Sequence, residues 1–214
     1  MRNLVISFVR RIRQGDLKNA LYLTYYYAYL MTYDVIHGTR FAVSHKPGDM
    51  GNEALSGSTG NFPAHPRLIR RYLQHANIDE RAPVIDIGHG SGTFLHVASL
   101  EGYTNLSGIE FGHIPFAMSQ RNLGERATLI HGDALALDLT PYRALFFFNP
   151  FRGDLAVTFF NRLPDNVLVV VSVNHDPVIE SILHLKGFSL DFLYSHPIYS
   201  NFNCKIWKRR PRHA

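Results

Sequence analysis

Residues 84–92 read Val84-Ile85-Asp86-Ile87-Gly88-His89-Gly90-Ser91-Gly92. A β-branched run ends on a carboxylate, glycine then appears at every second position, and an apolar segment with helical spacing begins at Thr93. This order predicts a strand, a tight loop and the start of a helix, which together bring a nucleotide-like ligand against bare backbone. Glycine suits such a loop because it permits turns with positive φ and leaves the backbone N–H groups accessible.

The spacing of the glycines distinguishes two kinds of cofactor site. A dinucleotide fingerprint has the form G-x-G-x-x-G, but here Thr93 occupies the third glycine's position and glycine falls one residue early, at Gly92. The pattern D-x-G-x-G-x-G instead resembles motif I of the class I S-adenosylmethionine (SAM)-dependent methyltransferases. A glycine-rich turn that holds no ligand is the alternative, because such patterns are permissive.

Composition and charge narrow the class of protein. The chain has 214 residues, is 46% hydrophobic and 18% charged, and carries a formal net charge of +5, which fits one globular domain with an extension. Basic residues gather near both ends, at Arg2, Arg10, Arg11, Arg13, Lys205, Lys208, Arg209, Arg210 and Arg212. Solvated termini explain them better than a nucleic-acid or lipid contact, since no long basic run occurs. Cys204 is the single cysteine and no secretory signal is present, so we expect a cytoplasmic protein without a disulfide framework.

Residues 1–37 contain no proline, and Gly15-Asp16 makes a plausible break, so we expect two helices there. An apolar stripe of the first helix lies beside arginines and comprises Leu4, Val5, Phe8, Val9 and Ile12. Docking on the chain's own domain is the preferred interpretation of this stripe, and weak peripheral contact with a membrane is the alternative. The second helix is rich in tyrosine, at Tyr22, Tyr25, Tyr26, Tyr27, Tyr29 and Tyr33. We expect most of these rings to pack against other elements, while some could line a substrate pocket.

Two further stretches complete the expected organisation of the chain. The apolar run at residues 21–36 is too short and too hydroxylated to span a bilayer. Residues 38–61 are polar and glycine-rich, and a loop of this length ahead of a ligand-binding core suggests a lid. The expected division is a helical extension and loop at residues 1–60, a core at residues 61–209 and a basic tail at residues 210–214.

Strand-like and helical runs alternate beyond residue 66. The expected strands are residues 83–87, 106–110, 128–131, 144–149 and 167–173, and the expected helices between them are residues 94–100, 114–122, 155–162 and 178–185. Continuous apolar strands covered on both faces predict an α/β fold with a doubly wound, mostly parallel sheet. Residues 188–192 and 202–208 lie too close for a helical crossover, so they should pair antiparallel. A seven-stranded sheet that ends in such a hairpin is typical of class I methyltransferases, whereas NAD-binding Rossmann domains lack the hairpin.

The resemblance assigns a cofactor role to the glycine loop. In class I methyltransferases this loop wraps the methionine end of SAM, and Gly88, Gly90 and Gly92 match its positions. Asp86 matches the acidic residue that precedes the loop, and His89 lies within it. The resemblance therefore implies that these five residues bind SAM.

The ends of the next two strands complete the expected cofactor site. The resemblance implies that Glu110, at the end of the second strand, binds the ribose hydroxyls, with Phe111 beside it. It also implies that Asp133 and Ala134, after the third strand, contact the adenine ring. An exposed strand-end glutamate and an aspartate that caps a turn are the alternatives for these positions.

The sequence Asn149-Pro150-Phe151 follows the fourth strand, at the edge where open α/β folds keep their reacting groups. It resembles the N-P-P-Y/F motif of amino-group methyltransferases but lacks one proline. The resemblance implies that Asn149 and the Pro150 carbonyl hold the acceptor, that Asn149 also contacts the cofactor, and that the Phe151 ring stacks on the acceptor. No strong base is then needed. A turn-forming Asn-Pro pair is the alternative. His175, after the fifth strand, is the candidate general base for an oxygen acceptor.

The resemblance as a whole implies a SAM-dependent methyltransferase that transfers a methyl group by direct in-line displacement. A small molecule or a protein side chain is the favoured acceptor, and an amino group is one option for the target. The alternatives are a catalytically silent SAM-fold binding or regulatory protein, a nucleic-acid methyltransferase and an NAD-dependent oxidoreductase. No nucleic-acid-binding appendage is recognisable. The twelve histidines form neither H-x-x-x-H nor H-E-x-x-H, so we expect no metal site.

Overall fold

Seven strands form one sheet in the computed structural model, which describes residues 16–44, 60 and 62–209. Their order is β3-β2-β1-β4-β5-β7-β6. The strands are β1 (Val84–Ile87), β2 (Leu106–Glu110), β3 (Thr128–His131), β4 (Ala144–Phe148), β5 (Val169–Val173), β6 (Phe188–Tyr194) and β7 (Cys204–Arg209). Neighbours pair in parallel except at β7, which is antiparallel to both β5 and β6. The prediction of a parallel sheet that ends in an antiparallel hairpin is confirmed.

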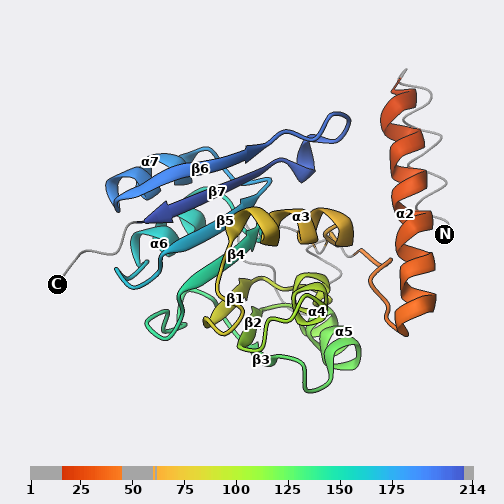
Figure 1. Cartoon of the computed structure of the whole chain (residues 1–214), viewed down its shortest axis with the longest axis horizontal. Helices are drawn as coiled ribbons and strands as arrows, with labels where there is room; N and C mark the ends of the chain where they lie inside the picture. The colour runs from red at the N-terminus through yellow and green to blue at the C-terminus, as the bar shows by residue number, and fades with distance from the viewer. Residues whose placement is uncertain (1–15, 45–59, 61, 210–214) are drawn as a thin grey trace.

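Helices cover both faces of the sheet (Figure 1). On one face lie α3 (Pro66–Ala76), α4 (Thr93–Leu100) and α5 (His113–Leu123), and on the other lie α6 (Asp154–Asn161) and α7 (Val178–Leu185). A short 3-10 helix, η2 (Ser200–Phe202), precedes β7. This doubly wound arrangement was predicted from the alternation of strand-like and helical runs.

Neighbouring residues of the central strands pack on opposite faces of the sheet. Phe146 of β4 stacks on Phe94 of α4, with ring centroids 3.9 Å apart, while Phe147 packs edge-on against Phe160 of α6 at 4.9 Å. All four rings are buried, and each contributes about 2 kcal/mol by removal of apolar surface from water. The continuous apolar run of β4 therefore forms a strand because both of its faces are covered.

Helix α2 (Leu17–His37) lies across the side of the molecule toward which the carboxyl ends of the parallel strands point (Figure 1). It ends at Gly38, which adopts the left-handed conformation with φ 67°. Tyr26, Leu30 and Tyr33 of its inner side belong to the same buried cluster as the sheet. Across the described part of the chain, no helix has the length and apolar character needed to cross a membrane. The helix expected before Gly15 lies outside the described residues.

The segment after α2 is attached to the glycine loop. The carboxylate of Asp34 accepts hydrogen bonds from one hydroxyl and two backbone N–H groups of residues 39–42. The backbone N–H of Arg40 donates to Oδ1 of Asn122, and the Asn122 amide donates to the carbonyl of Ser91, each at 2.9 Å. The lid expected at residues 38–61 lies mostly outside the described residues, and the division at residue 60 stays a prediction.

Candidate active site

The loop between β1 and α4 requires glycine for two independent reasons. Gly88, Gly90 and Gly92 adopt φ values of 69°, 56° and 89°, a region that residues with a Cβ rarely occupy. A Cβ at Gly88 would overlap the Cβ of Pro150, and a Cβ at Gly92 would lie 2.6 Å from Leu123 of α5. The loop therefore forms a cradle that larger residues would fill or distort.

Glu110 connects the end of β2 to the glycine loop. Its carboxylate is buried, and it accepts hydrogen bonds from the backbone N–H of Gly90 at 2.8 Å and of Gly112 at 2.6 Å. Burial raises the pKa of Glu110, and these two N–H groups oppose that rise. Each carboxylate oxygen retains a further lone pair, so the group can also accept from a pair of ligand hydroxyls.

Asp86 brings a second buried carboxyl group to the same region. It lies on β1 opposite Gly108 of β2 and is only 3% exposed. Burial and the nearby Glu110 carboxylate raise the pKa of Asp86 well above its ordinary value. A cationic ligand beside these two acids would favour their ionised forms and relieve their mutual repulsion.

His89 fills the space beside the glycine loop. Its Nδ1–H donates to the carbonyl of Gly90 at 2.9 Å, while Nε2 has no partner among the described residues. Burial lowers the pKa of His89 to about 4, so the ring is neutral at pH 7. Its Cδ2 would lie 2.6 Å from a Cβ at Gly108, which explains why glycine stands inside a buried strand. Sequence reasoning missed Gly108, although a glycine inside a strand is the usual sign of such a close approach.

The loops after β2 and β3 lie together at the edge of the sheet. The carbonyl of Phe111 accepts a hydrogen bond from Nε2 of His131 at 3.2 Å. Oδ1 of Asp133 accepts from the N–H of Leu135 at 2.8 Å, so this aspartate caps a turn, as one of the two interpretations expected. Ala134 packs partly against the hydrophobic cluster on the α6 side. The expected adenine contacts of these residues stay predictions.

Asn149 makes a sharp turn directly after β4. Its φ of 42° is left-handed, the residue is 4% exposed, and its Oδ1 accepts from Nε of Arg152 at 3.3 Å. The turn brings Pro150 against Gly88, so the loop after β4 contacts the glycine loop. Phe151 points the other way: its ring packs edge-on against Phe147 at 5.2 Å and is buried. The Phe151 ring thus belongs to the core, and its expected stacking on an acceptor stays a prediction.

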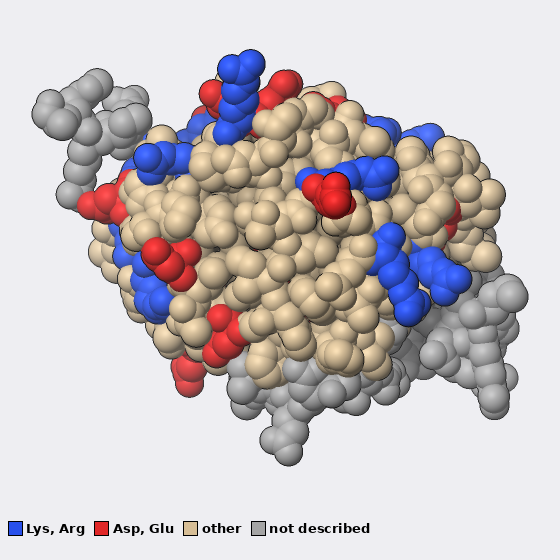
Figure 2. Space-filling model, turned by 90° about the horizontal axis from the view of Figure 1, so that it is seen from below, with Lys and Arg blue, Asp and Glu red and all other residues tan. Residues whose placement is uncertain are grey.

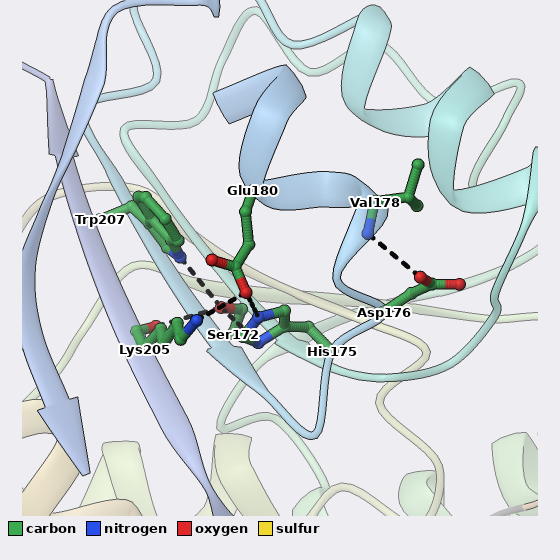
Figure 3. Close-up of polar contacts among 7 residues, drawn as sticks. All are labelled: Ser172, His175, Asp176, Val178, Glu180, Lys205 and Trp207. Carbon is green, nitrogen blue, oxygen red and sulfur yellow. Dashed lines mark hydrogen bonds and ion pairs between the residues drawn. The ribbon is translucent and has the colours of Figure 1, made fainter. Parts of the chain in front are cut away.

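His175 belongs to a polar network after β5 (Figure 3). Its Nδ1 lies 3.3 Å from Oγ of Ser172, and its Nε2 lies 3.0 Å from Oε1 of Glu180. The same Glu180 oxygen pairs with Nζ of Lys205 at 2.5 Å, and Nε1 of Trp207 donates to the Ser172 hydroxyl at 3.3 Å. Both ring nitrogens of His175 have partners within the protein, so its expected role as a general base stays a prediction.

Asp176 links the loops after β4 and β5. Its Oδ2 accepts from the N–H of Gly153 at 3.0 Å, and its Oδ1 accepts from the N–H of Val178 at 3.1 Å. These two hydrogen bonds lower the pKa of Asp176. Gly153 ends the turn that begins at Asn149, so Asp176 restrains that turn from the neighbouring loop. No local motif in the sequence indicated this contact.

Aromatic side chains lie beside the loop after β4. Phe148 contacts Phe62 and Phe202, with ring centroids 6.4 and 6.2 Å apart. The Tyr26 ring is buried in this cluster, and its hydroxyl donates to the carbonyl of Pro63. The expected packing role of the tyrosines is thus confirmed for Tyr26. Within residues 16–44, 60 and 62–209, no three His, Cys, Asp or Glu side chains are placed to hold a metal ion.

Solved structures with this architecture include several methyltransferases. Magnesium protoporphyrin IX methyltransferase from Synechocystis PCC 6803, with bound SAM, superposes with a TM-score of 0.56 at 15% identity and covers 68% of this chain and 80% of its own. An RNA methyltransferase from Salinibacter ruber, in complex with S-adenosyl-L-homocysteine, superposes with a TM-score of 0.53 at 17% identity and covers 72% and 97%. Ribosomal protein L11 methylase from Lactobacillus delbrueckii subsp. bulgaricus gives 0.54 at 17% identity over 70% and 81%. The chain has the class I SAM-dependent methyltransferase fold, as its sequence predicted.

One curated protein matches a short segment of the chain in sequence. EEF1A lysine methyltransferase 2 from Danio rerio is 33% identical over 57 residues, which make up 27% of this chain. The match spans 24% of the length of that relative. No protein-family model matches the chain.

Proposed function

We propose that this chain, which has the class I SAM-dependent methyltransferase fold, binds SAM at the glycine loop and transfers its methyl group to an acceptor held beside Asn149. The observation that carries the proposal is the contact between the two loops, since a Cβ at Gly88 would overlap Pro150. The expected cofactor loop and the expected acceptor loop are therefore in contact at the carboxyl edge of the sheet. Open α/β sheets bind their ligands at this edge.

The described residues suit SAM in three respects. The glycine loop leaves space that a Cβ would fill, and its φ values exclude most other residues. The Glu110 carboxylate has lone pairs for two ribose hydroxyls. Asp86 and Glu110 form a buried acidic pair that favours a cation nearby. When bound, SAM supplies a methyl group on a positively charged sulfonium, which a correctly aimed lone pair can attack in line.

The chain contributes positioning to this reaction. Asn149 presents an amide at the end of β4, and Arg152 orients its oxygen. Asp176 holds the far end of the same turn through Gly153. A fixed turn of this kind accelerates transfer because it converts an encounter into a near-attack geometry. This arrangement supports transfer without a strong general base, in keeping with the two partners of His175.

An amino group on a small molecule or on a protein side chain is the proposed acceptor. The order Asn-Pro-Phe after β4 supports this choice, as does the short similarity to a lysine methyltransferase. On the face seen in Figure 2, Lys and Arg are interspersed with Asp and Glu among the described residues. A nucleic-acid interface instead gathers basic side chains along one stripe.

Calorimetric titration with SAM and with S-adenosylhomocysteine tests the cofactor half of the proposal. We expect both to bind, and absence of binding by either would contradict the proposal. For the acceptor half, the purified chain is incubated with labelled SAM and a cell lysate, which is then separated into proteins, nucleic acids and small metabolites. Label in proteins or small metabolites supports the proposal, whereas label confined to nucleic acid contradicts the assignment of the acceptor.

Asn149→Gly tests the acceptor loop without straining its backbone, because glycine accommodates a φ of 42°. We expect methyl transfer to the labelled fraction to fall at least about 100-fold while the affinity for SAM stays within about threefold, since only acceptor positioning is lost. Asn77→Gly is the matched control, because Asn77 is also left-handed, with φ 48°, but ends α3 in an exposed position. An unchanged rate of methyl transfer in Asn149→Gly would show that Asn149 does not position the acceptor.

A further inference from the structure

We propose that the outer face of α2 binds an anionic lipid surface. This outer face consists of the exposed apolar side chains Leu17, Leu21, Tyr25, Met31, Val35 and Ile36. Val35 and Ile36 are 84% and 72% exposed, and the other four are between 48% and 56% exposed. The proposal is independent of the proposed methyl transfer.

The outer face runs along the whole of α2. The helix has 21 residues and is therefore about 30 Å long. Lys18 and Asp34 are its only Lys, Arg, Asp or Glu residues, and Thr24 and Thr32 are the exposed uncharged polar residues of the helix. Its inner side is buried through Tyr26, Leu30 and Tyr33, and Figure 1 shows it at one end of the molecule. One side is thus anchored in the core while the other presents a long apolar stripe to the solvent.

The side chains around the outer face are basic. Lys18 is exposed in the first turn of α2, and Arg40 is exposed just beyond its end. Arg67, at the start of α3, donates to the hydroxyl of Tyr25 at 3.3 Å and lies over the ring of Tyr29 at 4.9 Å.

The acidic groups nearby are engaged locally. Asp34 directs its carboxylate at the backbone of residues 39–42, from which it accepts hydrogen bonds. Asp16, which precedes the helix, accepts from Nδ2 of Asn19 at 2.9 Å. Among the described residues that border the outer face, Lys18, Arg40 and Arg67 therefore outnumber Asp16 and Asp34.

This combination fits the boundary of an anionic bilayer. Aliphatic side chains enter the region between headgroups and acyl chains, tyrosine lies at headgroup level, and lysine and arginine contact the lipid phosphates. A second copy of the chain fits less well, because an isologous contact would bring the same basic borders together. Since α2 is not suited to cross a membrane, the contact lies at the surface.

Sedimentation of the full chain with lipid vesicles tests the proposal. We expect at least about tenfold tighter binding to vesicles that contain one-third phosphatidylglycerol than to phosphatidylcholine vesicles, and weaker binding at high salt. The double substitution Val35→Asp with Ile36→Asp should weaken binding to the anionic vesicles at least about tenfold. Lys18→Glu should reduce the preference for the anionic vesicles and leave the weak binding to phosphatidylcholine unchanged.

Leu185→Asp is the matched control, because Leu185 is 89% exposed on α7, far from α2 (Figure 1). We expect it to leave vesicle binding unchanged, and circular dichroism melting checks that every variant folds. Three outcomes would overturn the proposal: no sedimentation with either vesicle, equal losses in the α2 and α7 variants, or a dimer by light scattering that Val35→Asp dissociates. The last outcome would assign the outer face to a second copy of the chain.

Discussion

The two halves of the sheet's carboxyl edge hold their polar side chains in different ways. In the half formed by β1, β2 and β3, carboxylates accept from backbone N–H groups, as Glu110 does from Gly90 and Gly112. In the half formed by β4 and β5, Asp176 also accepts from backbone N–H groups, but here side chains bind one another as well, as His175 does with Ser172 and Glu180 (Figure 3). The first half is proposed to bind the cofactor and the second to present the acceptor.

The two halves differ in which parts of the chain supply their hydrogen-bonding groups. In the first half the glycine loop supplies a backbone donor, and the carboxylate that accepts from it comes from the end of the adjacent strand β2. In the second half, His175 binds side chains close to it in the sequence, and Glu180 also pairs at 2.5 Å with Lys205 of the antiparallel strand β7, so this network depends on the closing hairpin. Substitutions in the first half should therefore change ligand binding directly, whereas substitutions in the second should change the rate of transfer.

The largest effect is expected for Gly88→Ala. The added Cβ would overlap Pro150, and the alanine would have to adopt a φ of 69°, which is unfavourable for residues with a Cβ. Both the glycine loop and the loop after β4 would therefore be displaced. We expect SAM affinity to fall more than about 100-fold and stability to fall by about 2 kcal/mol. Calorimetry and urea unfolding measure the two quantities.

Gly132→Ala is the control for this substitution, because a Cβ at Gly132, after β3, would have nothing within 4 Å. We expect it to bind SAM as the unmodified chain does. Equal damage from both substitutions would show that the edge does not depend on the contact between the two loops.

A smaller effect is expected for Glu110→Gln. The substitution replaces one acceptor oxygen of the side chain by an NH₂ group, which would face a backbone N–H. We expect SAM affinity to fall at least about tenfold at pH 8. Glu125→Gln, at an exposed position after α5, is the control and should leave the affinity unchanged. Calorimetric titration of all three proteins gives the comparison.

The pH dependence of SAM binding sharpens the same comparison. Burial raises the pKa of Glu110 above its ordinary value of 4.5, so its ionised form, which accepts from the ribose hydroxyls, is lost at a higher pH than in an exposed glutamate. Affinity should therefore be constant at high pH and should fall on acidification, beginning above pH 4.5. Glu110→Gln should reduce this fall and leave the part that comes from Asp86, whose buried carboxyl group also has a raised pKa. An unchanged pH profile in that variant would exclude Glu110 as a contributor.

In the second half, Asp176→Ala should lower the rate of transfer about tenfold without changing SAM affinity. The substitution releases Gly153 from the neighbouring loop and so loosens the turn that presents Asn149. Asp138→Ala is the control, because the Asp138 side chain also caps a turn, but its hydrogen bonds go to Thr140, two residues ahead in the same loop. Single-turnover rates and calorimetry separate the two effects, and a loss of SAM affinity in Asp176→Ala would contradict the division between the halves.

The smallest effect is expected at His96 of α4, the helix that follows the glycine loop. Both of its ring nitrogens are buried without a partner in the described structure, next to Tyr33 and Phe41. Burial lowers the pKa of His96 to about 4, below the unfolded value of 6.5, so the folded state resists protonation and loses stability as the pH falls from 6.5 toward 4. His96→Phe should reduce this loss and stabilise the protein by about 1 kcal/mol at pH 5.

Urea unfolding at pH 8 and pH 5 measures the His96 effect. His75→Phe is the control, because His75 is exposed on α3 and stacks on Phe192 with ring centroids 3.8 Å apart. A larger pH dependence in His96→Phe than in the unmodified chain would contradict the burial of a neutral ring.

Much of the fold was predictable from local patterns. The strands at residues 106–110 and 128–131, the start of α4 at Thr93 and the closing hairpin were all expected, because each rests on side-chain spacing within a few residues. The turn of Asp133 was one of two expectations, since Gly-Asp pairs often cap turns. The inward direction of Phe151 was not expected, because only the packed Phe147 and Phe159 rings make a place for it.

By itself, the sequence determined the α/β class, the glycine loop and the carboxylate at the end of β2, because backbone geometry and apolar periodicity act over short distances along the chain. Only the tertiary structure decided how the loop after β4 meets Gly88, how Asp176 restrains it and how Asn122 joins Arg40 to Ser91. These contacts join residues up to 82 positions apart. No local pattern encodes them, since each depends on which surfaces the packed sheet and helices bring together.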